Sequence, residues 1–114
     1  MSFKNTTNPL TLVQVNSNTF NGAYASSGLT FPGPVVQLRF INQSNVDAYI
    51  SYDGVTNHDL VAAGTQANLN FQTNALPTNY SAALPQGITV YLMGLVAGVG
   101  EVTITGYYIK SGSY

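Results

Sequence analysis

The residues best suited to catalysis lie close together in one short segment. His58 is the only histidine of the chain, Asp59 follows it directly, and Ser51 lies shortly upstream. Serine, histidine and aspartate are the parts of a nucleophilic triad, in which the histidine must point at a serine held on a sharp turn. The sequence has no Gly-x-Ser-x-Gly motif, and residues so close in a hairpin rarely face one another in this way. We therefore predict that the protein is not an enzyme and that His58 is exposed on a loop.

The same segment offers oxygen ligands for a cation, in Asp53, Asn57 and Asp59. It lacks the ligand spacing and the distal glutamate of an EF-hand. Aspartate and asparagine are also favoured in turns, because their side chains bond to nearby backbone groups. Zinc is excluded because the chain has no cysteine and one histidine. We expect no metal site.

A glycine-rich segment, Gly94–Gly100, follows an apolar run. A phosphate-binding loop would need a helix directly after it, and a lysine in the Walker type. The residues that follow alternate between apolar and polar, as a strand does. We therefore interpret Gly94–Gly100 as a hairpin connection and expect no nucleotide or other cofactor.

Aromatic side chains remain as candidates for recognition, since the chain has eight tyrosines and five phenylalanines. Tyrosine beside asparagine or glutamine suits carbohydrate, because flat ring faces then lie next to amide donors and acceptors. Tyrosine is equally frequent in strands and in protein interfaces. The candidate partner contacts are Tyr24, Phe31, Tyr49, Tyr80, Tyr91, Tyr107 and Tyr114.

The near absence of charge is the most unusual property of the composition. The 114 residues fit one domain, and 45% of them are hydrophobic, but only 6% are charged, whereas about 25% is typical. A neutral exposed surface of an extracellular β protein is one explanation. A surface covered by other subunits is favoured, because interface cores are poor in Lys, Glu and Asp and rich in aromatic residues. A formal charge of −1 also opposes association only weakly. We predict a homo-oligomer.

Composition also argues against several other partners. Three basic residues are too few for the phosphate contacts of a nucleic-acid-binding protein. No apolar run approaches the roughly 20 residues that span a membrane. The first residues lack the apolar core of a signal peptide, and there is no cysteine for a disulfide framework. We expect synthesis in a cytoplasm, with release from the cell as part of a particle left open.

Period-two alternation of apolar and polar side chains recurs along the chain, and helical periodicity is nearly absent. This alternation is typical of strands with one face on a core and the other face outward. The clearest runs are residues 36–40, 46–52, 67–71, 88–92 and 102–105, with a short strand near Asp59–Ala62. The predicted fold class is all-β: a single antiparallel β-sandwich with about seven or eight strands.

Turn-forming residues separate these runs. Asn42–Asn45, Asp53-Gly54, Ala63–Thr65 and the glycine-rich segment are interpreted as connections between antiparallel neighbours. Residues 74–87 contain two prolines, show no clear alternation and are long enough to cross between two sheets. Such a crossover favours a Greek-key arrangement over a simple meander, and both a jelly roll and an immunoglobulin-like sandwich stay open.

The first third of the chain has a different pattern. Leu10–Val15 is predicted as a strand, but Asn16–Pro34 is rich in Asn, Ser and Gly and has no clear period. Structureless stretches of this length are uncommon in compact domains unless they have a function. We therefore divide the chain into residues 1–34, a strand plus an extended arm or loop that reaches a neighbouring subunit, and residues 35–114, the β-sandwich core.

The central segment resembles a known class of protein. A strand that ends in asparagine leads into a second strand that closes on Ser51-Tyr52-Asp53-Gly54; a glycine-bearing turn at residues 63–65 and an alternating strand at 68–72 follow, and Gly106-Tyr107-Tyr108 lies in the closing strand. This pattern, over about residues 35–109, is similar to small β-sandwich virion proteins of tailed bacteriophages.

The resemblance implies a structural role in the particle, without catalytic residues. The expected function is that of a capsid decoration or cement protein, or of a head–tail or tail accessory protein. Its partners would be further copies of itself and other virion proteins, and it would be located in the virion after synthesis in the host cytoplasm. The alternative is a carbohydrate-binding β-sandwich module that uses exposed Tyr and Asn side chains.

Overall fold

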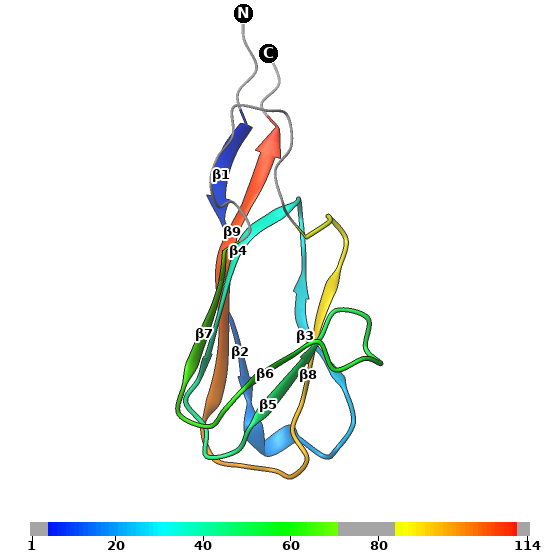
Figure 1. Ribbon diagram of the computed structural model, residues 1–114, viewed down its shortest axis with the longest axis vertical. Helices are drawn as coiled ribbons and strands as arrows, with labels where there is room; N and C mark the ends of the chain where they lie inside the picture. Colours follow the sequence, from blue (N-terminus) through cyan, green and yellow to red (C-terminus); the bar gives the residue numbers. More distant parts are fainter. Residues whose placement is uncertain (1–4, 71–83, 112–114) are drawn as a thin grey trace, which may run out of the picture.

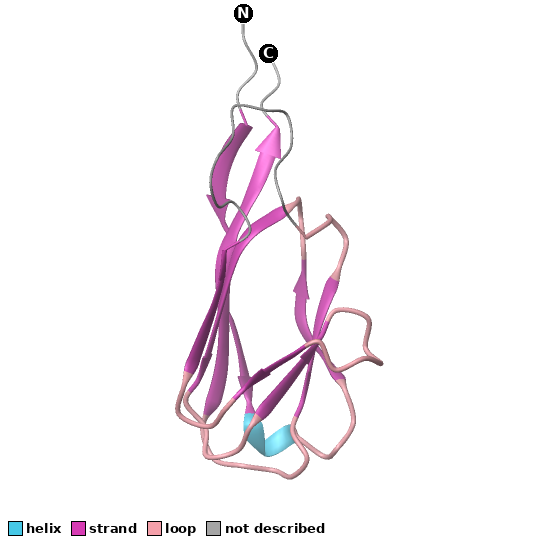
Figure 2. Ribbon diagram, in the orientation of Figure 1, coloured by secondary structure: helices cyan, strands magenta, loops and turns pink. Residues whose placement is uncertain are grey.

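The protein folds into two packed β-sheets, as the computed structural model shows for residues 5–70 and 84–111 (Figures 1 and 2). These residues form nine strands and one short 3-10 turn, η1, at Ser17–Thr19. The strands are β1 (Asn5–Pro9), β2 (Val13–Asn16), β3 (Ala25–Thr30), β4 (Val35–Asn42), β5 (Ala48–Ser51), β6 (Asp59–Val61), β7 (Gln66–Asn70), β8 (Thr89–Met93) and β9 (Glu101–Ser111). The predicted all-β sandwich is confirmed.

Strand pairing gives the sandwich a jelly-roll topology. Sheet A has the order β1-β9-β4-β7, with β2 also on β9, and sheet B has the order β3-β8-β5-β6. From β2 onward, each strand of the first half pairs antiparallel with its counterpart in the second half: β2 with β9, β3 with β8, β4 with β7, and β5 with β6. This is the pattern of one long hairpin rolled into two sheets. An immunoglobulin-like sandwich would instead pair several sequential strands.

The strand count exceeds the predicted seven or eight because one edge strand is interrupted. Both β1 and β2 pair with β9, and Leu10–Leu12 separate them. Leu10 turns into the core there, while its N–H still donates to the carbonyl of Gly106 at 2.8 Å.

The loop between β5 and β6, which contains Asp53-Gly54, is a hairpin connection, as expected. The connections at Asn42–Asn45, Ala63–Thr65 and Gly94–Gly100 are not hairpins, because the strands on either side of each lie in different sheets. The prediction of antiparallel sequential neighbours was therefore wrong at these three places. Turn residues mark a chain reversal, but they do not indicate whether the next strand pairs with the previous one or joins the facing sheet.

The crossover predicted at residues 74–87 joins β7 in sheet A to β8 in sheet B, so its two ends lie in different sheets as expected. Residues 71–83 lie outside the described part of the chain. In the described residues that precede β8, Leu84 exchanges two backbone hydrogen bonds of 2.9 Å with Val35 of β4.

The division of the chain into an arm and a core was wrong. Strands β1 and β2 pair with β9, β3 pairs with β8, and Phe20, Leu29 and Phe31 are buried in the common core. In β3 the buried positions are Ser27 and Leu29, and the pairing with β8 shifts register between Ser26 and Thr30. A buried serine within an irregular strand hides the alternation on which the prediction depended.

The core lies between the sheets and follows the predicted alternation in the later strands. In β4, Leu38 and Phe40 are fully buried and Arg39 between them is exposed. The fully buried large side chains also include Ile50, Val90, Val102 and Ile104 from the strands of both sheets. At one end of the molecule, β1 and the last part of β9 run on as a two-stranded ribbon beyond β4 (Figure 1). The β8–β9 connection lies at the opposite end.

Candidate functional site

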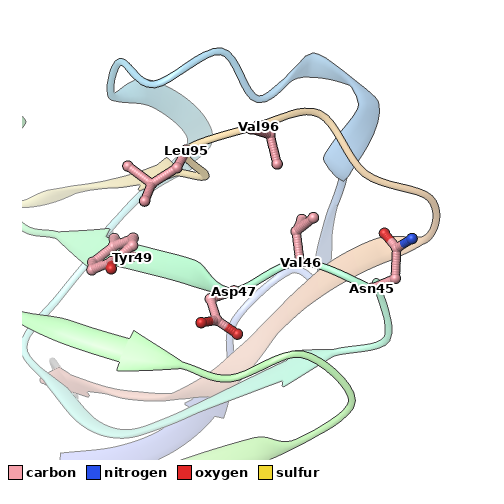
Figure 3. Close-up of a pocket in the computed structure, with 6 residues that line it drawn as sticks. All are labelled: Asn45, Val46, Asp47, Tyr49, Leu95 and Val96. Atoms are coloured by element: carbon pink, nitrogen blue, oxygen red, sulfur yellow. The ribbon is translucent and has the colours of Figure 1, made fainter.

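A hollow of about 270 Å³ lies at the end of the sandwich that carries the β8–β9 connection. Figure 3 shows its walls, which come from segments far apart in the sequence. Its lining residues are Asn45, Val46, Asp47, Tyr49, Leu95 and Val96. Asn45 to Asp47 belong to the β4–β5 connection, Tyr49 to β5, and the two aliphatic residues to the β8–β9 connection. Tyr49 faces outward because its strand neighbours Ala48 and Ile50 are fully buried.

Backbone amides hold the two polar side chains of the hollow in place. The Oδ1 atom of Asn45 accepts the N–H of Val99 at 2.8 Å, and Oδ1 of Asp47 accepts the N–H of Ala63 at 2.9 Å. Within the described residues, Nδ2 of Asn45 and Oδ2 of Asp47 make no hydrogen bond. One backbone N–H thus fixes the orientation of each of these two polar side chains.

The apolar wall of the hollow is unusually exposed. Leu95 is 65% exposed, Val96 is 62% exposed, and nearby Val99 is 76% exposed. In Figure 3, Leu95 lies across from the ring of Tyr49, and Val96 lies across from Val46. A group of exposed aliphatic side chains beside oriented polar groups is typical of a contact or ligand site.

The β8–β9 connection approaches the β4–β5 connection so closely that a glycine is required. A Cβ atom at Gly98 would lie 2.6 Å from Cγ2 of Val46 and 2.7 Å from Oδ1 of Asn45. The glycines of this segment thus serve backbone packing, and the Leu95–Val96 wall is fixed relative to Asn45.

Two further tyrosines on the outward side of sheet B hold the β5–β6 loop. The hydroxyl of Tyr24 donates to Oδ1 of Asn57. The ring of Tyr91 covers Gly54, where an added Cβ would lie 3.3 Å from the ring. Burial raises the pKa of Tyr24, and the nearby Asp53 and Tyr49 raise it further.

The structure does not bring the candidate triad together. The hydroxyl of Ser51 donates to Oδ1 of Asp53 at 2.7 Å, and it accepts the N–H groups of Asp53 and Gly54. His58 is exposed, and its Nδ1 accepts the backbone N–H of Tyr52 at 3.0 Å. Ser51 is fully buried and bonds to the loop rather than to the histidine. These residues shape the β5–β6 loop.

The candidate cation ligands are likewise separated by their hydrogen bonds. Asp53 accepts the N–H groups of Thr56 and Val55 at 2.8 Å each, and these bonds hold the pKa of its carboxyl well below the ordinary value. Asp59 accepts the hydroxyl of Tyr52 at 2.9 Å. Among the residues that the structure describes, no group of three or more His, Cys, Asp or Glu side chains is placed to hold a metal ion.

The predicted partner contacts are distributed over the molecule. Tyr49 lines the hollow, Tyr91 lies in β8 of the same sheet, Tyr24 directly precedes β3, and Tyr107 is 43% exposed on sheet A. Phe31 is only 1% exposed, so its prediction as a partner contact was wrong: its ring fills the core. Tyr80 and Tyr114 lie outside the described residues.

Sequence reasoning missed the roles of Asn45, Asp47, Leu95 and Val96. One signal was available, since two aliphatic residues in a glycine-rich connection outside any alternating run are unusual where turns are normally polar. The meeting of two connections at one end of the sandwich, however, follows from the strand pairing and is not visible in the local sequence.

The outward face of sheet A is broad and nearly neutral. Cross-strand pairs place Arg39 between Asn68 of β7 and Thr105 of β9. Among the side chains that the structure describes, Arg39 is the only charged one in the middle of this face, and Glu101 lies at its end. The remaining side chains of this face are those of Gln14, Gln37, Ile41, Gln66, Asn68, Asn70, Thr105 and Tyr107; Thr103 lies among them but is buried and accepts a hydrogen bond from Gln14.

Comparison of the chain with protein-family models and with curated proteins finds no match. No helix in residues 5–70 and 84–111 is long and apolar enough to cross a membrane. Function is therefore inferred from the jelly-roll topology, the neutral face of sheet A, the hollow beside Tyr49 and the chemistry of their side chains.

Proposed function

We propose that this protein is a structural component of a tailed-phage virion that acts through protein–protein contacts, as a capsid decoration or cement protein or as a head–tail or tail accessory protein. The sequence resemblance over about residues 35–109 supports this role. Jelly rolls are used in viral capsids and in lectins, so the topology is compatible with the proposal without defining it. The observation that carries the proposal is the neutral outward face of sheet A.

This face suits burial against another protein. Its amide and hydroxyl groups exchange hydrogen bonds with water for hydrogen bonds with a partner, whereas buried charges would need to be paired. Ile41 and the exposed ring of Tyr107 add apolar area. Interface cores have the same composition, with few Lys, Glu and Asp residues.

Three of the carboxylates lie away from the outward face of sheet A. The chain has four carboxylates in Asp and Glu side chains. Asp47 is bonded to the N–H of Ala63, Asp53 caps the β5–β6 loop, and Asp59 accepts the hydroxyl of Tyr52. These three carboxylates belong to sheet B and its connections, so none of them places a charge on the outward face of sheet A.

A second copy of the chain is the first partner of this face. A flat sheet face can meet its own copy across a two-fold axis or a different patch of the next copy in a ring. Contacts with other virion proteins and location in the virion are parts of the same proposal. The proposal includes no catalysis, since Ser51 and His58 bond separately within one loop.

Sedimentation velocity over a micromolar concentration series tests the proposal. The wild-type chain is compared with a double variant, Gln37→Lys with Gln66→Lys, which adds two positive charges to the outward face of sheet A. The control, Val55→Lys with Gln86→Lys, adds the same charge at exposed loop positions. We expect the wild type and the control to associate and the sheet A variant to sediment as a monomer. Association of the sheet A variant equal to that of the control, or a wild-type monomer throughout, would contradict this role for the face.

A further inference from the structure

We propose that the hollow beside Tyr49 is a sugar-binding site that accepts a single pyranose ring. The site lies on the β4–β5 and β8–β9 connections and on the outward side of sheet B, away from the outward face of sheet A. The site therefore lies on a surface that the proposed assembly leaves free. Sugar binding there does not depend on the protein being a virion component.

The polar groups of the hollow match the hydroxyl groups of a sugar. A hydroxyl both donates and accepts hydrogen bonds, so one sugar hydroxyl can donate to Oδ2 of Asp47 and a different one can accept from Nδ2 of Asn45. The acceptance of the Val99 N–H by Oδ1 fixes which end of the Asn45 amide faces outward as a donor. A hydrogen bond to a carboxylate oxygen is of the stronger, charge-assisted kind.

The two groups are also oriented before a ligand arrives. Each side chain is tethered by a backbone N–H, that of Ala63 at 2.9 Å and that of Val99 at 2.8 Å. Binding a ligand then orders fewer free rotamers than it would at two untethered surface side chains. Two hydrogen bonds join the two connections: Val99 N–H donates to Oδ1 of Asn45 at 2.8 Å, and Asn45 N–H donates to the carbonyl of Val99 at 3.2 Å.

The remaining walls match the apolar face of a sugar ring. The ring of Tyr49 offers a flat aromatic surface, and Leu95 and Val96 offer exposed aliphatic carbon opposite it (Figure 3). A pyranose presents C–H groups on one face and hydroxyls at its edge, so it satisfies both kinds of wall at once. Covering these side chains also removes apolar surface from water.

The size and charge of the hollow argue against other ligand classes. Its volume of about 270 Å³ lies just below the roughly 300–1,000 Å³ typical of pockets for drug-sized molecules. An anion would face Asp47 with no basic residue in the lining. A purely apolar ligand would cover a carboxylate without giving it a partner, which is costly. A basic side chain satisfies Asp47, but it leaves the Asn45 donor without an acceptor.

Ligand-observed and protein-observed NMR on the full chain test the site. The probes are the methyl glycosides of glucose, galactose, mannose and N-acetylglucosamine, and the acetylated amide of lysine as the competing basic ligand. We expect saturable, roughly millimolar binding of at least one glycoside. It should shift the amide signals of Ala63 and Val99, whose N–H groups hold the two polar side chains. The absence of any such shift with all four glycosides would overturn the proposal.

Three variants separate a sugar site from a basic-ligand site. Tyr49→Ala should raise Kd about tenfold by removing the aromatic face, whereas Tyr49→Phe should leave it nearly unchanged. Asp47→Asn keeps an acceptor oxygen, so it should weaken sugar binding only moderately and abolish binding of a cation. Val55→Ala removes an exposed apolar side chain from the β5–β6 loop, outside the hollow and sheet A, so it is the control and should have no effect. Preferential binding of the lysine derivative, lost in Asp47→Asn, would replace the sugar with a basic partner side chain.

Discussion

The buried carboxamide of Asn42 accepts the hydroxyl of Ser44 at 2.6 Å and the N–H of the same serine at 3.0 Å. From the other end of the amide, Nδ2 donates to the carbonyls of Val46 and Val61 at 2.9 Å each. One side chain thus closes the turn after β4 and ties it to β6 in the facing sheet. The asparagine at the end of β4 therefore has a structural role in joining the sheets.

Replacing Asn42 with alanine should destabilise the fold strongly. The substitution leaves the carbonyl of Val61 and both groups of Ser44 without their amide partner in a buried place, and a cost of about 2–4 kcal/mol is expected. Urea denaturation followed by circular dichroism measures it. Asn68→Ala, at an exposed position of sheet A, is the control and should change the free energy of unfolding by less than about 0.5 kcal/mol. Equal effects of the two substitutions would show that the Asn42 network contributes little.

Much of the fold could be predicted from local sequence, because the strands with one buried and one outward face show period-two alternation. The run around Leu38 and Phe40 became β4, and the run around Val102 and Ile104 became part of β9. The alternation failed in β3, where Ser27 occupies a buried position and donates to the carbonyl of Val90 at 2.8 Å. A serine satisfied by a distant strand cannot be distinguished from a solvated one in the sequence.

The candidate site was harder to predict than the strands. The importance of Tyr49 followed from its residue type and its place in a strand. Its partners in the hollow did not follow, because Asp47 and Leu95 meet only after the chain has crossed between the sheets twice. Local patterns predict which way a side chain points, whereas the meeting of two connections depends on the pairing order of the strands.

Gly106 should be intolerant of any side chain, because it pairs with Leu38 of β4 where backbone atoms of β4 occupy the Cβ position. An added Cβ would lie 2.2 Å from the carbonyl oxygen of Gln37 and 3.1 Å from Cα of Leu38. Both are backbone atoms of a central strand, so relief requires the two strands to separate. We expect Gly106→Ala to lower the free energy of unfolding by more than about 2 kcal/mol, or to prevent folding.

Gly64→Ala provides the comparison for Gly106→Ala. Gly64 has a φ of +72° but open space around its Cβ position. Only the left-handed conformation is then penalised, at about 1–2 kcal/mol. Thermal unfolding of both variants gives the order: Gly106→Ala should be the less stable of the two. The reverse order would mean that β9 can move away from β4 without loss.

Asp53 should make stability fall under acid conditions. Its folded-state pKa is lowered by the N–H groups of Thr56 and Val55 and by the hydroxyl of Ser51. A lowered pKa means that the folded state binds its proton less readily than the unfolded chain, so the stabilisation is present above the unfolded pKa of about 3.9. It is lost as the pH falls through the folded pKa. The denaturation midpoint measured between about pH 2 and pH 7 should fall less steeply for Asp53→Asn than for the wild type.

Tyr52 should make stability fall under alkaline conditions. Burial raises the pKa of its hydroxyl, and the neighbouring Asp59 raises it further through charge and through their hydrogen bond. The folded state therefore holds this proton more tightly than the unfolded chain, whose tyrosine pKa is about 10. Stability is fully present below that value and declines as the pH rises toward the folded pKa. Tyr52→Phe should reduce this decline above about pH 10, as measured by urea denaturation at a series of pH values. The same decline in the variant and the wild type would argue against the Tyr52–Asp59 bond.

The two residues that first suggested catalysis should differ in how stability depends on them. Ser51 is fully buried, and its Oγ bonds to Asp53 and accepts the N–H of Gly54, so Ser51→Ala should cost about 1–3 kcal/mol and loosen the β5–β6 loop. His58 is exposed and accepts one backbone N–H, which water can replace, so His58→Ala should cost less than about 1 kcal/mol. Neither substitution should change self-association through the outward face of sheet A, and sedimentation of both variants checks this. A catalytic pair would show the reverse: stability would be unaffected by either substitution, while a measurable turnover would be lost in both.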